Sequence, residues 1–267
     1  MRRSRNFALS GCVAAFLVFS AGILCESARA QTAPPAASAP WPDEARFPAD
    51  PAALAAPVPY ETLAAFLAEI GRKPHIQVTE ELKTPGGRSL FLVHANRGGE
   101  AARWRVFFVG QQHGDEPAGK DALLYLLRDI AERPDRLPRD VDLWVAPQAN
   151  PDGAAANRRR NANGADLNRD HTLLSQPETR ALHAIVRRLR PHVTVDCHEF
   201  GRDSAEYFDR GWLEWPLIMM DTANHPLYPA GLYEAGLRWV EAARPVMAGA
   251  GYNYTRYFVG GAPPEDE

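Results

Sequence analysis

The sequence has few cysteines and no excess of charge of either sign. It contains three cysteines in 267 residues, and Cys12 and Cys25 both fall in the first thirty. If that segment is removed, Cys197 is the one that remains, so no intramolecular disulfide can form. The formal net charge is −3, which predicts neither nucleic-acid binding nor attachment to an anionic membrane. No internal repeat occurs, and the 45% hydrophobic content is that of a globular chain.

The N-terminal residues 1–30 are expected to lie outside the fold, as a signal peptide. A basic start (MRRSR) precedes an apolar stretch of about 18 residues, and Ala28-Arg29-Ala30 forms a cleavage site. The stretch is short for a transmembrane helix, so we expect export to the periplasm or beyond, with no stable insertion in the membrane. Cys12 precedes most of the apolar stretch, which argues against lipoprotein processing. Residues 31–58 are rich in Pro and Ala and predict a linker.

The remaining residues, 59–267, are predicted to form one α/β domain. The predicted helices have apolar residues at helical spacing and cover residues 60–71, 117–132, 177–190 and 231–248. The predicted strands are rich in β-favouring residues and cover residues 75–84, 89–94, 103–110, 141–146 and 192–197. A Pro-Gly-Gly turn joins the first two strands into a hairpin. Because strands and helices alternate, we expect a mixed, mostly parallel sheet with helices on both faces.

Two of these strands end in residues that can bind a metal ion. The sequence RVFFVGQQHGDE runs from a buried strand into a turn that carries His113 and Glu116, three positions apart. His198 follows the strand 192–197 in the same way. Sites in open α/β sheets lie at such strand ends, and two imidazoles with one carboxylate form an ordinary zinc ligand set. The sequence therefore predicts one zinc ion per chain, with a fourth position open to water or substrate.

The loop between the second and third ligands is rich in arginine and amide side chains. It contains Arg158–Arg160 and the pair Asn168-Arg169. A guanidinium beside an amide suits a substrate carboxylate, because the planar fork can bind both oxygens. Asp196 and Glu199 flank His198, where they are candidates to orient its ring.

Taken in order, HGDE, NPDG, RRN, DLNRD, PETRAL and DCHEF resemble the motifs of the funnelin-type, carboxypeptidase A-like zinc metallocarboxypeptidases, in a short bacterial form. The resemblance extends from about Phe107 to Phe200. It implies that zinc activates water to hydrolyse the C-terminal amide bond of a peptide. The residues it assigns to zinc are His113, Glu116 and His198. It assigns Arg159 to stabilise the oxyanion of the tetrahedral intermediate, although the match within Arg158–Arg160 can shift by one residue. It assigns Asn168 and Arg169 to bind the free C-terminal carboxylate of the substrate.

The end of the chain departs from the family pattern. In the family, the general-base glutamate lies on a strand well beyond the third ligand, after a loop with a mobile tyrosine. Tyr252, Tyr254 and Tyr257 are candidates for that tyrosine, but Glu265 and Glu267 lie in a Pro-led tail. We therefore expect a domain that is incomplete at its C-terminus, with the last part of its sheet missing, and we assign no general base.

Two alternatives remain open at this point. One is an N-acyl amino acid deacylase related to aspartoacylase and succinylglutamate desuccinylase, which shares the ligand pattern. The other is a non-catalytic zinc-binding or peptide-binding remnant, which the missing base favours. The predicted export and the NPDG motif favour the peptidase.

Overall fold

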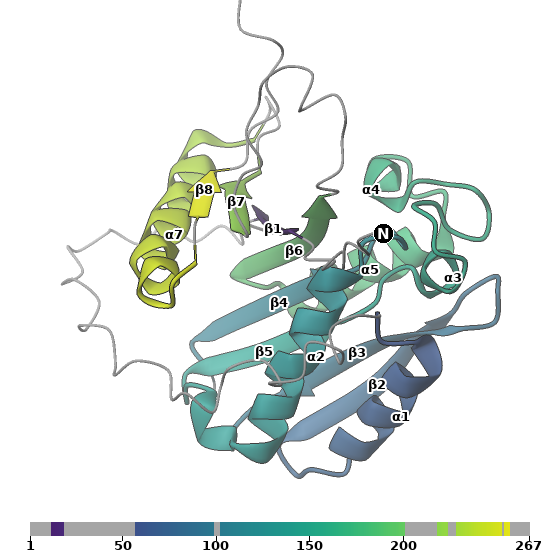
Figure 1. The fold of residues 1–267 in the computed structure, drawn as a ribbon, viewed down its shortest axis with the longest axis horizontal. Coiled ribbons are helices and arrows are strands. Elements are labelled where there is room, and N and C mark those ends of the chain that lie inside the picture. Colours follow the sequence, from purple (N-terminus) through teal and green to yellow (C-terminus); the bar gives the residue numbers. More distant parts are fainter. Residues whose placement is uncertain are drawn as a thin grey trace, which may run out of the picture.

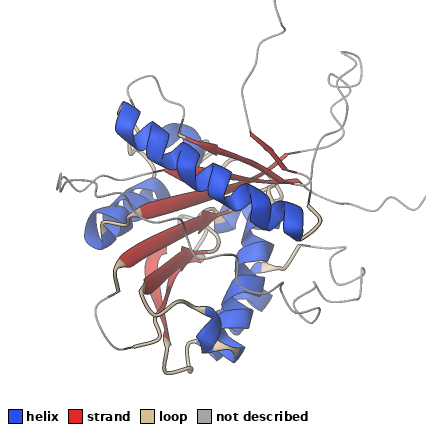
Figure 2. Cartoon of the chain, turned by 90° about the vertical axis from the view of Figure 1, so that its left-hand side faces the viewer, coloured by secondary structure: helices blue, strands red, loops and turns tan. Residues whose placement is uncertain are grey.

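The described part of the chain forms a single sheet with helices on both faces (Figures 1 and 2). The computed structural model describes residues 12–18, 57–98, 102–200, 218–223, 228–252 and 254–256. The strands are β1 (Cys12–Val18), β2 (Ile76–Lys83), β3 (Ser89–Ala95), β4 (Trp104–Gly110), β5 (Val141–Ala146), β6 (Val193–Phe200), β7 (Ile218–Thr222) and β8 (Tyr254–Arg256). The helices are α1 (Tyr60–Ile70), α2 (Pro117–Glu132), the 3₁₀ turn η3 (Pro134–Arg136), α3 (Pro151–Ala155), α4 (Leu167–Asp170), α5 (Pro177–Leu189) and α7 (Ala230–Gly249).

The strand order is β2-β3-β5-β4-β6-β1-β7-β8. Strand β4 pairs in parallel with β5 and β6, and β7 pairs in parallel with β1 and β8. The pairs β2–β3, β3–β5 and β1–β6 are antiparallel. The predicted mixed sheet and the predicted hairpin are therefore confirmed. The parallel arrangement of β4 and β6 brings their carboxyl ends, and hence the predicted metal ligands, to the same edge.

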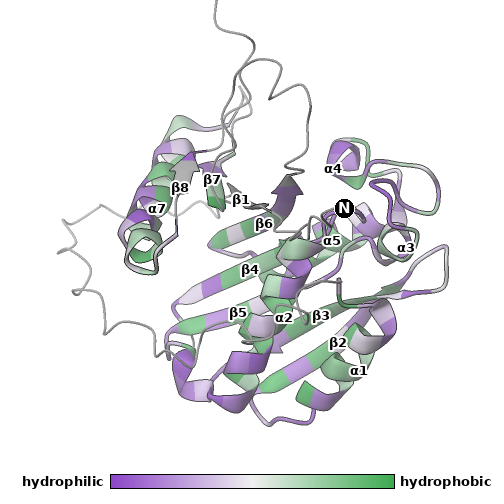
Figure 3. Ribbon diagram, in the orientation of Figure 1, coloured by the Kyte–Doolittle hydropathy of each residue, from purple (hydrophilic) through white to green (hydrophobic). Residues whose placement is uncertain are grey.

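The two faces of the sheet have separate apolar cores because side chains alternate along each strand. On β4, Phe107 and Val109 pack with α5, whereas Val106 and Phe108 pack with the core that includes α1 and α2. Figure 3 shows the resulting apolar strands, with hydrophilic colour at the carboxyl end of β6. Among the described helices, none combines the length and the apolar character needed to cross a bilayer.

Strand β1 is formed by residues from the segment 1–30, which the sequence predicts to be a signal peptide. Cys12–Val18 pairs antiparallel with β6 and parallel with β7, so it joins the two halves of the sheet. A short apolar run satisfies the patterning rules of a buried strand as well as those of a signal peptide, and periodicity does not separate the two. Here the run supplies backbone hydrogen bonds to both neighbouring strands. Its removal as a signal peptide remains a prediction.

Other differences concern element boundaries. Strand β6 extends to Phe200, so His198 lies within the strand instead of after it, because Ala14 of β1 pairs with it there. The polar loop contains the short helices α3 and α4, which begin at caps formed by Asn150 and Asp166. Strands β7 and β8 were not predicted. Tyr257, Glu265 and Glu267 lie outside the described residues.

Helix α2 crosses β6 at a glycine. A Cβ atom added to Gly119 would lie 2.6 Å from Cβ of Cys197 and 3.2 Å from its carbonyl oxygen. Real Cβ atoms do not approach this closely, so the absence of a side chain at Gly119 fixes how near α2 lies to the strand that carries His198.

The substitution Gly119→Ala is expected to lower the free energy of unfolding by about 1–3 kcal/mol, as overpacking does. This loss should exceed the gain of up to about 1 kcal/mol in helix propensity. Gly231→Ala in α7 is the matched control, because its added Cβ meets nothing within 4 Å. Denaturant unfolding of both variants measures the difference. Equal stability of the two variants would contradict the close packing of α2 on β6.

Candidate metal centre

The three predicted ligands meet around the carboxylate of Glu116. Its Oε1 lies 2.7 Å from Nδ1 of His113, and its Oε2 lies 2.8 Å from Nδ1 of His198. The candidate donor atoms all lie within 4.8 Å of one another, and both imidazoles are only 3% exposed. Two ring nitrogens and a carboxylate oxygen thus lie close enough together to bind one metal ion, and two histidines with one glutamate are a known zinc ligand set.

The opposite nitrogens of the two rings are held by other carboxylates. Nε2 of His113 lies 3.2 Å from Oδ1 of Asp166, and Nε2 of His198 lies 3.0 Å from Oδ2 of Asp196. An imidazole whose Nε2–H donates to a carboxylate directs the lone pair of its Nδ1 the other way. Both rings are therefore oriented to offer Nδ1 to a metal ion, and this donor set fits zinc.

The electrostatics of the centre are those of a buried cluster of opposite charges. Burial alone would raise the pKa of Glu116, but hydrogen bonds with His113 and His198 lower it to about 2. Burial alone would lower the pKa of His198, but the carboxylates of Asp196 and Glu116 raise it to about 10. A divalent cation bound between these groups would displace the proton of His198, as is general for histidine ligands.

Arg159 lies at the rim of the centre. Its Nε donates to Oδ2 of Asp166 at 2.8 Å, and its Nη1 lies 3.5 Å from Oε1 of Glu116. Asp166 therefore holds both Arg159 and His113. Burial would raise the pKa of Asp166, but the Arg159 guanidinium and His113 outweigh it and lower this pKa. Arg160, in contrast, donates to the carbonyl of Gly164, so Arg159 is the member of the run that reaches the ligands.

The two predicted carboxylate-binding residues occupy different surroundings. The amide nitrogen of Asn168 lies 3.1 Å from Nε2 of His198, which places Asn168 directly beside a ligand. Arg169 is exposed, and its Nη1 donates to the carbonyl of Asn168. It lies near enough to contribute to the lowered pKa of Asp166. The guanidinium of Arg169 thus stands at the solvent side of the centre.

Of the two residues expected to orient His198, only Asp196 contacts its ring. Glu199 points to the other face of β6, where its Oε2 accepts a hydrogen bond from the backbone N–H of Ala118 at the start of α2. Burial raises the pKa of Glu199, and the nearby carboxylate of Glu116 adds to the increase. The expectation that Glu199 orients His198 is wrong, because alternate residues of a strand face opposite sides.

The turn that carries the ligands is held by buried amide side chains. Gln111, directly after β4, has a positive φ of 50°, and its Nε2 donates to the carbonyl of Gly114 at 2.8 Å. Asn150 donates from Nδ2 to the carbonyls of Gln112 and Arg159. Gly114 contacts the α3 backbone so closely that an added Cβ would lie 2.1 Å from the carbonyl carbon of Gly153. These contacts fix the ligand turn and the arginine loop to one another.

Several other motif residues have structural contacts that sequence reasoning did not assign. Asp152 accepts hydrogen bonds from Gly86 and Arg88 in the β2–β3 turn. Asp170 accepts from Ser175, Gln176 and Thr179 and so holds the start of α5. Side-chain hydrogen bonds also link Asn161 to Glu178, which is fully buried. The sequence could have indicated these contacts, because the residues lie in turns and at helix starts, where Asn and Asp side chains cap backbone groups.

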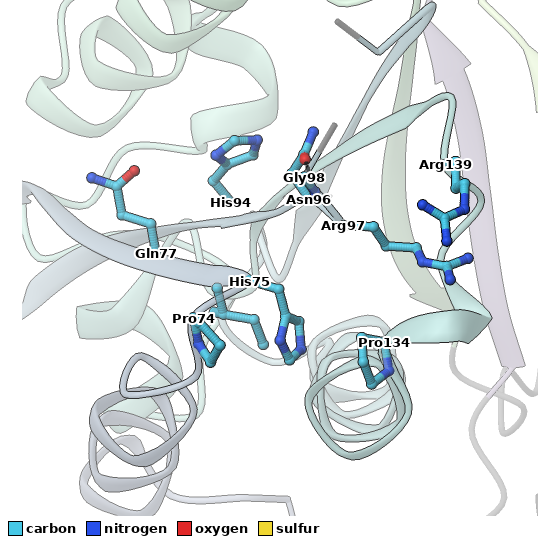
Figure 4. A pocket seen from close by; sticks show the side chains of 10 residues that line it. Pro74, His75, Gln77, His94, Asn96, Arg97, Gly98, Pro134 and Arg139 are labelled. Atoms are coloured by element: carbon cyan, nitrogen blue, oxygen red, sulfur yellow. Dashed lines mark hydrogen bonds between the residues drawn. The ribbon is translucent and has the colours of Figure 1, made fainter. Parts of the chain in front are cut away.

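A hollow of about 630 Å³ lies at the opposite end of the strands, where β2 begins and β3 ends (Figure 4). Two of its polar side chains have partners within the fold: Arg97 donates to the carbonyls of Asp135 and Leu137, and His94 lies 3.3 Å from Asp142. It is therefore separate from the metal centre.

Comparison with known proteins identifies the family. A family model described as zinc carboxypeptidase matches residues 63–206. "Probable carboxypeptidase 2" of Trichophyton verrucosum is 33% identical over 151 residues, which cover 52% of this chain and 29% of that protein. "Carboxypeptidase SOL1" of Arabidopsis thaliana is 33% identical over 134 residues, which cover 43% of this chain and 27% of that protein. The chain thus spans less than a third of these relatives.

Solved structures show the same fold. A metallo-carboxypeptidase from Burkholderia cenocepacia aligns with a TM-score of 0.53 at 20% identity, over 74% of this chain and 53% of that one. Carboxypeptidase A from Helicoverpa armigera aligns with a TM-score of 0.53 at 18% identity, over 75% and 57%. The family model covers more than half of the chain, from α1 past β6, and includes the three candidate ligands and the arginine loop. The chain therefore belongs to the zinc carboxypeptidase family.

Proposed function

We propose that this chain provides the zinc-binding and carboxylate-binding parts of an exported carboxypeptidase, which hydrolyses the C-terminal peptide bond of its substrate. The observation that carries the proposal is the convergence of two Nδ1 atoms on Glu116, with a carboxylate behind each ring. Zinc held by these residues would polarise a scissile carbonyl and activate a water molecule. The basic start and the cleavage site in residues 1–30 support export.

The remaining side chains have complementary tasks in this proposal. Asp166 and Asp196 keep the ligand rings in the required tautomer and orientation. Arg159, held by Asp166 at the rim, donates to the oxygen that becomes negative in the transition state. Asn168 and Arg169 hold the terminal carboxylate of the substrate, which selects the last peptide bond. Glu199 is engaged at the start of α2, so we do not assign it as the general base.

The first test concerns the metal. The full chain is expected to bind one zinc ion, and His198→Ala should remove most of it, because three protein ligands are needed to hold the ion. Elemental analysis after dialysis measures the content. His75→Ala is the control, since His75 lies at the opposite edge of the sheet. Equal zinc content in the wild type and in a His113→Ala/His198→Ala variant would exclude this site.

The second test compares two aspartates of the DLNRD motif. Asp166→Asn should weaken zinc binding by about 10–100-fold, as loss of a carboxylate behind a ligand does, because it releases both His113 and Arg159. Asp170→Asn should instead lower the unfolding midpoint and leave zinc affinity almost unchanged, since Asp170 holds the start of α5. Zinc titration and denaturant unfolding of both variants separate these effects. Identical profiles for the two variants would show that Asp166 does not orient the ligands.

The third test concerns the substrate carboxylate. A peptide with a free C-terminus should bind the zinc-loaded chain about 10–100-fold more tightly than its C-terminal amide, which is the range for hydrogen bonds to charged groups. Arg169→Ala should remove most of that difference, whereas Arg160→Ala should retain it. If amidation affects the wild type and Arg169→Ala equally, Arg169 does not hold the carboxylate.

Hydrolysis of the peptide with no hydrolysis of an N-acyl amino acid would distinguish a peptidase from a deacylase.

A further inference from the structure

The hollow of about 630 Å³ at the opposite end of the strands from the metal centre is lined by two arginines, Arg97 and Arg139 (Figure 4). Its other polar side chains are those of His75, Gln77, His94 and Asn96, and none of the described lining residues is acidic. Its volume is in the range of pockets that bind small ligands. A concave surface with charge of one sign concentrates ions of the opposite sign, so the hollow favours an anion.

Arg97 is held in place with one edge of its guanidinium free. It follows β3 and is half-buried, and its Nη1 donates to the carbonyls of Asp135 and Leu137 at 3.3 and 3.2 Å. These carbonyls lie in η3 and directly after it, so they fix the side chain against the fold. Among the described residues, none accepts a hydrogen bond from Nε or Nη2 of Arg97. These two donors form a fork that can bind two oxygens of one oxyanion.

Arg139 brings a second guanidinium to the same hollow. It lies exposed in the turn before β5, and Figure 4 shows its guanidinium on the same side of the hollow as that of Arg97. Within the part of the chain that the structure describes, Arg139 has no hydrogen-bond or ion-pair partner. Two like charges that share one hollow repel each other. A bound anion would offset that repulsion.

The carboxylate of Asp142, which lies behind the hollow, is engaged by other side chains. Asn96 donates from Nδ2 to its Oδ1, and Nε2 of His94 lies 3.3 Å from the same oxygen. Oδ1 of Asn96 in turn accepts from the backbone N–H of Gly98. These contacts order the turn that carries Arg97 and leave both guanidinium groups without a carboxylate among the described residues.

We propose that this hollow binds a tetrahedral oxyanion, the phosphate or sulfate group of a small polar molecule, between Arg97 and Arg139. A carboxylate has two oxygens in one plane, which one guanidinium fork satisfies. A phosphate or sulfate group presents at least three oxygens in different directions, so it can engage two guanidinium groups at once. The polar side chains of His75 and Gln77 suit a hydroxylated carrier such as a sugar. The site lies apart from the metal centre and does not depend on the proposed peptidase function.

The experiment follows the Nε–H resonances of Arg97 and Arg139 by NMR in the zinc-loaded full chain, while inorganic phosphate, sulfate or acetate is added. Phosphate and sulfate should shift both resonances and bind at least about tenfold more tightly than acetate, the range for a hydrogen bond to a charged group. Glucose 6-phosphate distinguishes the sources of the anion. Tighter binding than inorganic phosphate identifies a phosphate ester as the ligand, whereas equal affinity identifies the free ion.

Lysine variants separate the guanidinium fork from its charge and assign the two resonances. Arg97→Lys and Arg139→Lys should each weaken phosphate binding about tenfold, because an ammonium group keeps the charge but lacks the fork. Arg103→Lys is the matched control and should bind as the wild type does. Arg103 lies at the same end of the strands, directly before β4, but its guanidinium stacks on the ring of Trp104 at 5.2 Å.

The Arg139→Lys variant keeps the test independent of folding, since Arg139 is exposed and should have the unfolding midpoint of the wild type. An anion bound at the metal centre would not shift these two resonances, so binding there is not mistaken for binding in the hollow. Equal affinity for phosphate and acetate, no shift of either resonance, or wild-type affinity in both lysine variants would overturn the assignment.

Discussion

The arrangement of this site depends on the Glu116 carboxylate between two buried imidazoles. A carboxylate loses much hydration free energy when it is buried, and here two imidazole nitrogens at 2.7 and 2.8 Å compensate for the loss. The two histidines are 85 residues apart in the sequence: His113 lies in the turn after β4, and His198 lies on β6. The compensation is complete only when β4 and β6 lie side by side in parallel and α2 begins directly after Glu116. The contacts of Glu116 therefore form only when the central strands β4 and β6 are paired in this order.

The loops around the centre divide into residues that face the ligands and residues that hold the loops. Within the DLNRD motif, Asp166 binds His113 and Arg159, whereas Asp170 binds the first turn of α5. Within NPDG, Asn150 fixes the arginine loop through backbone carbonyls. Most of these buried polar atoms are paired, as native structures require. Oδ1 of Asp196 is a departure from that rule, because it is buried and has no hydrogen-bond partner among the described residues.

Much of the architecture could be predicted from the sequence because local patterns and long-range contacts agree. The strand 103–110, the helix 117–132 and the hairpin carry clear periodicity and turn residues, and all three are observed. The convergence of the three candidate ligands was also predictable, since two strand ends of one sheet each carry a histidine. The contact of Asp196 with the His198 ring was also expected, from its place two residues before the histidine. The contact of Asp166 with His113 was not predicted, because a carboxylate in a polar loop is usually solvated.

The rest could not be predicted because it depends on which segments pair. Cys12–Val18 has the apolar composition of an export signal, and only the hydrogen-bonding needs of β6 and β7 show that it can also serve as a strand. The prediction that Glu199 orients His198 was wrong for a similar reason. Its neighbour His198 faces the metal centre, and the extension of β6 through both residues turns Glu199 to the opposite face.

The close packing of Gly119 on Cys197 also means that the reactivity of Cys197 depends on whether α2 stays in contact with β6. The thiol of Cys197 is buried, and burial raises its pKa, so alkylating reagents, which react with thiolates, cannot modify it in the closed fold. Labelling requires α2 to separate from β6, and the free energy of that local opening sets the rate. A zinc ion held by Glu116 at the start of α2 and by His198 on β6 would oppose the opening in proportion to its occupancy. With zinc bound there, the rate at which the Cys197 thiol is labelled would depend on how much of the candidate site is occupied by metal.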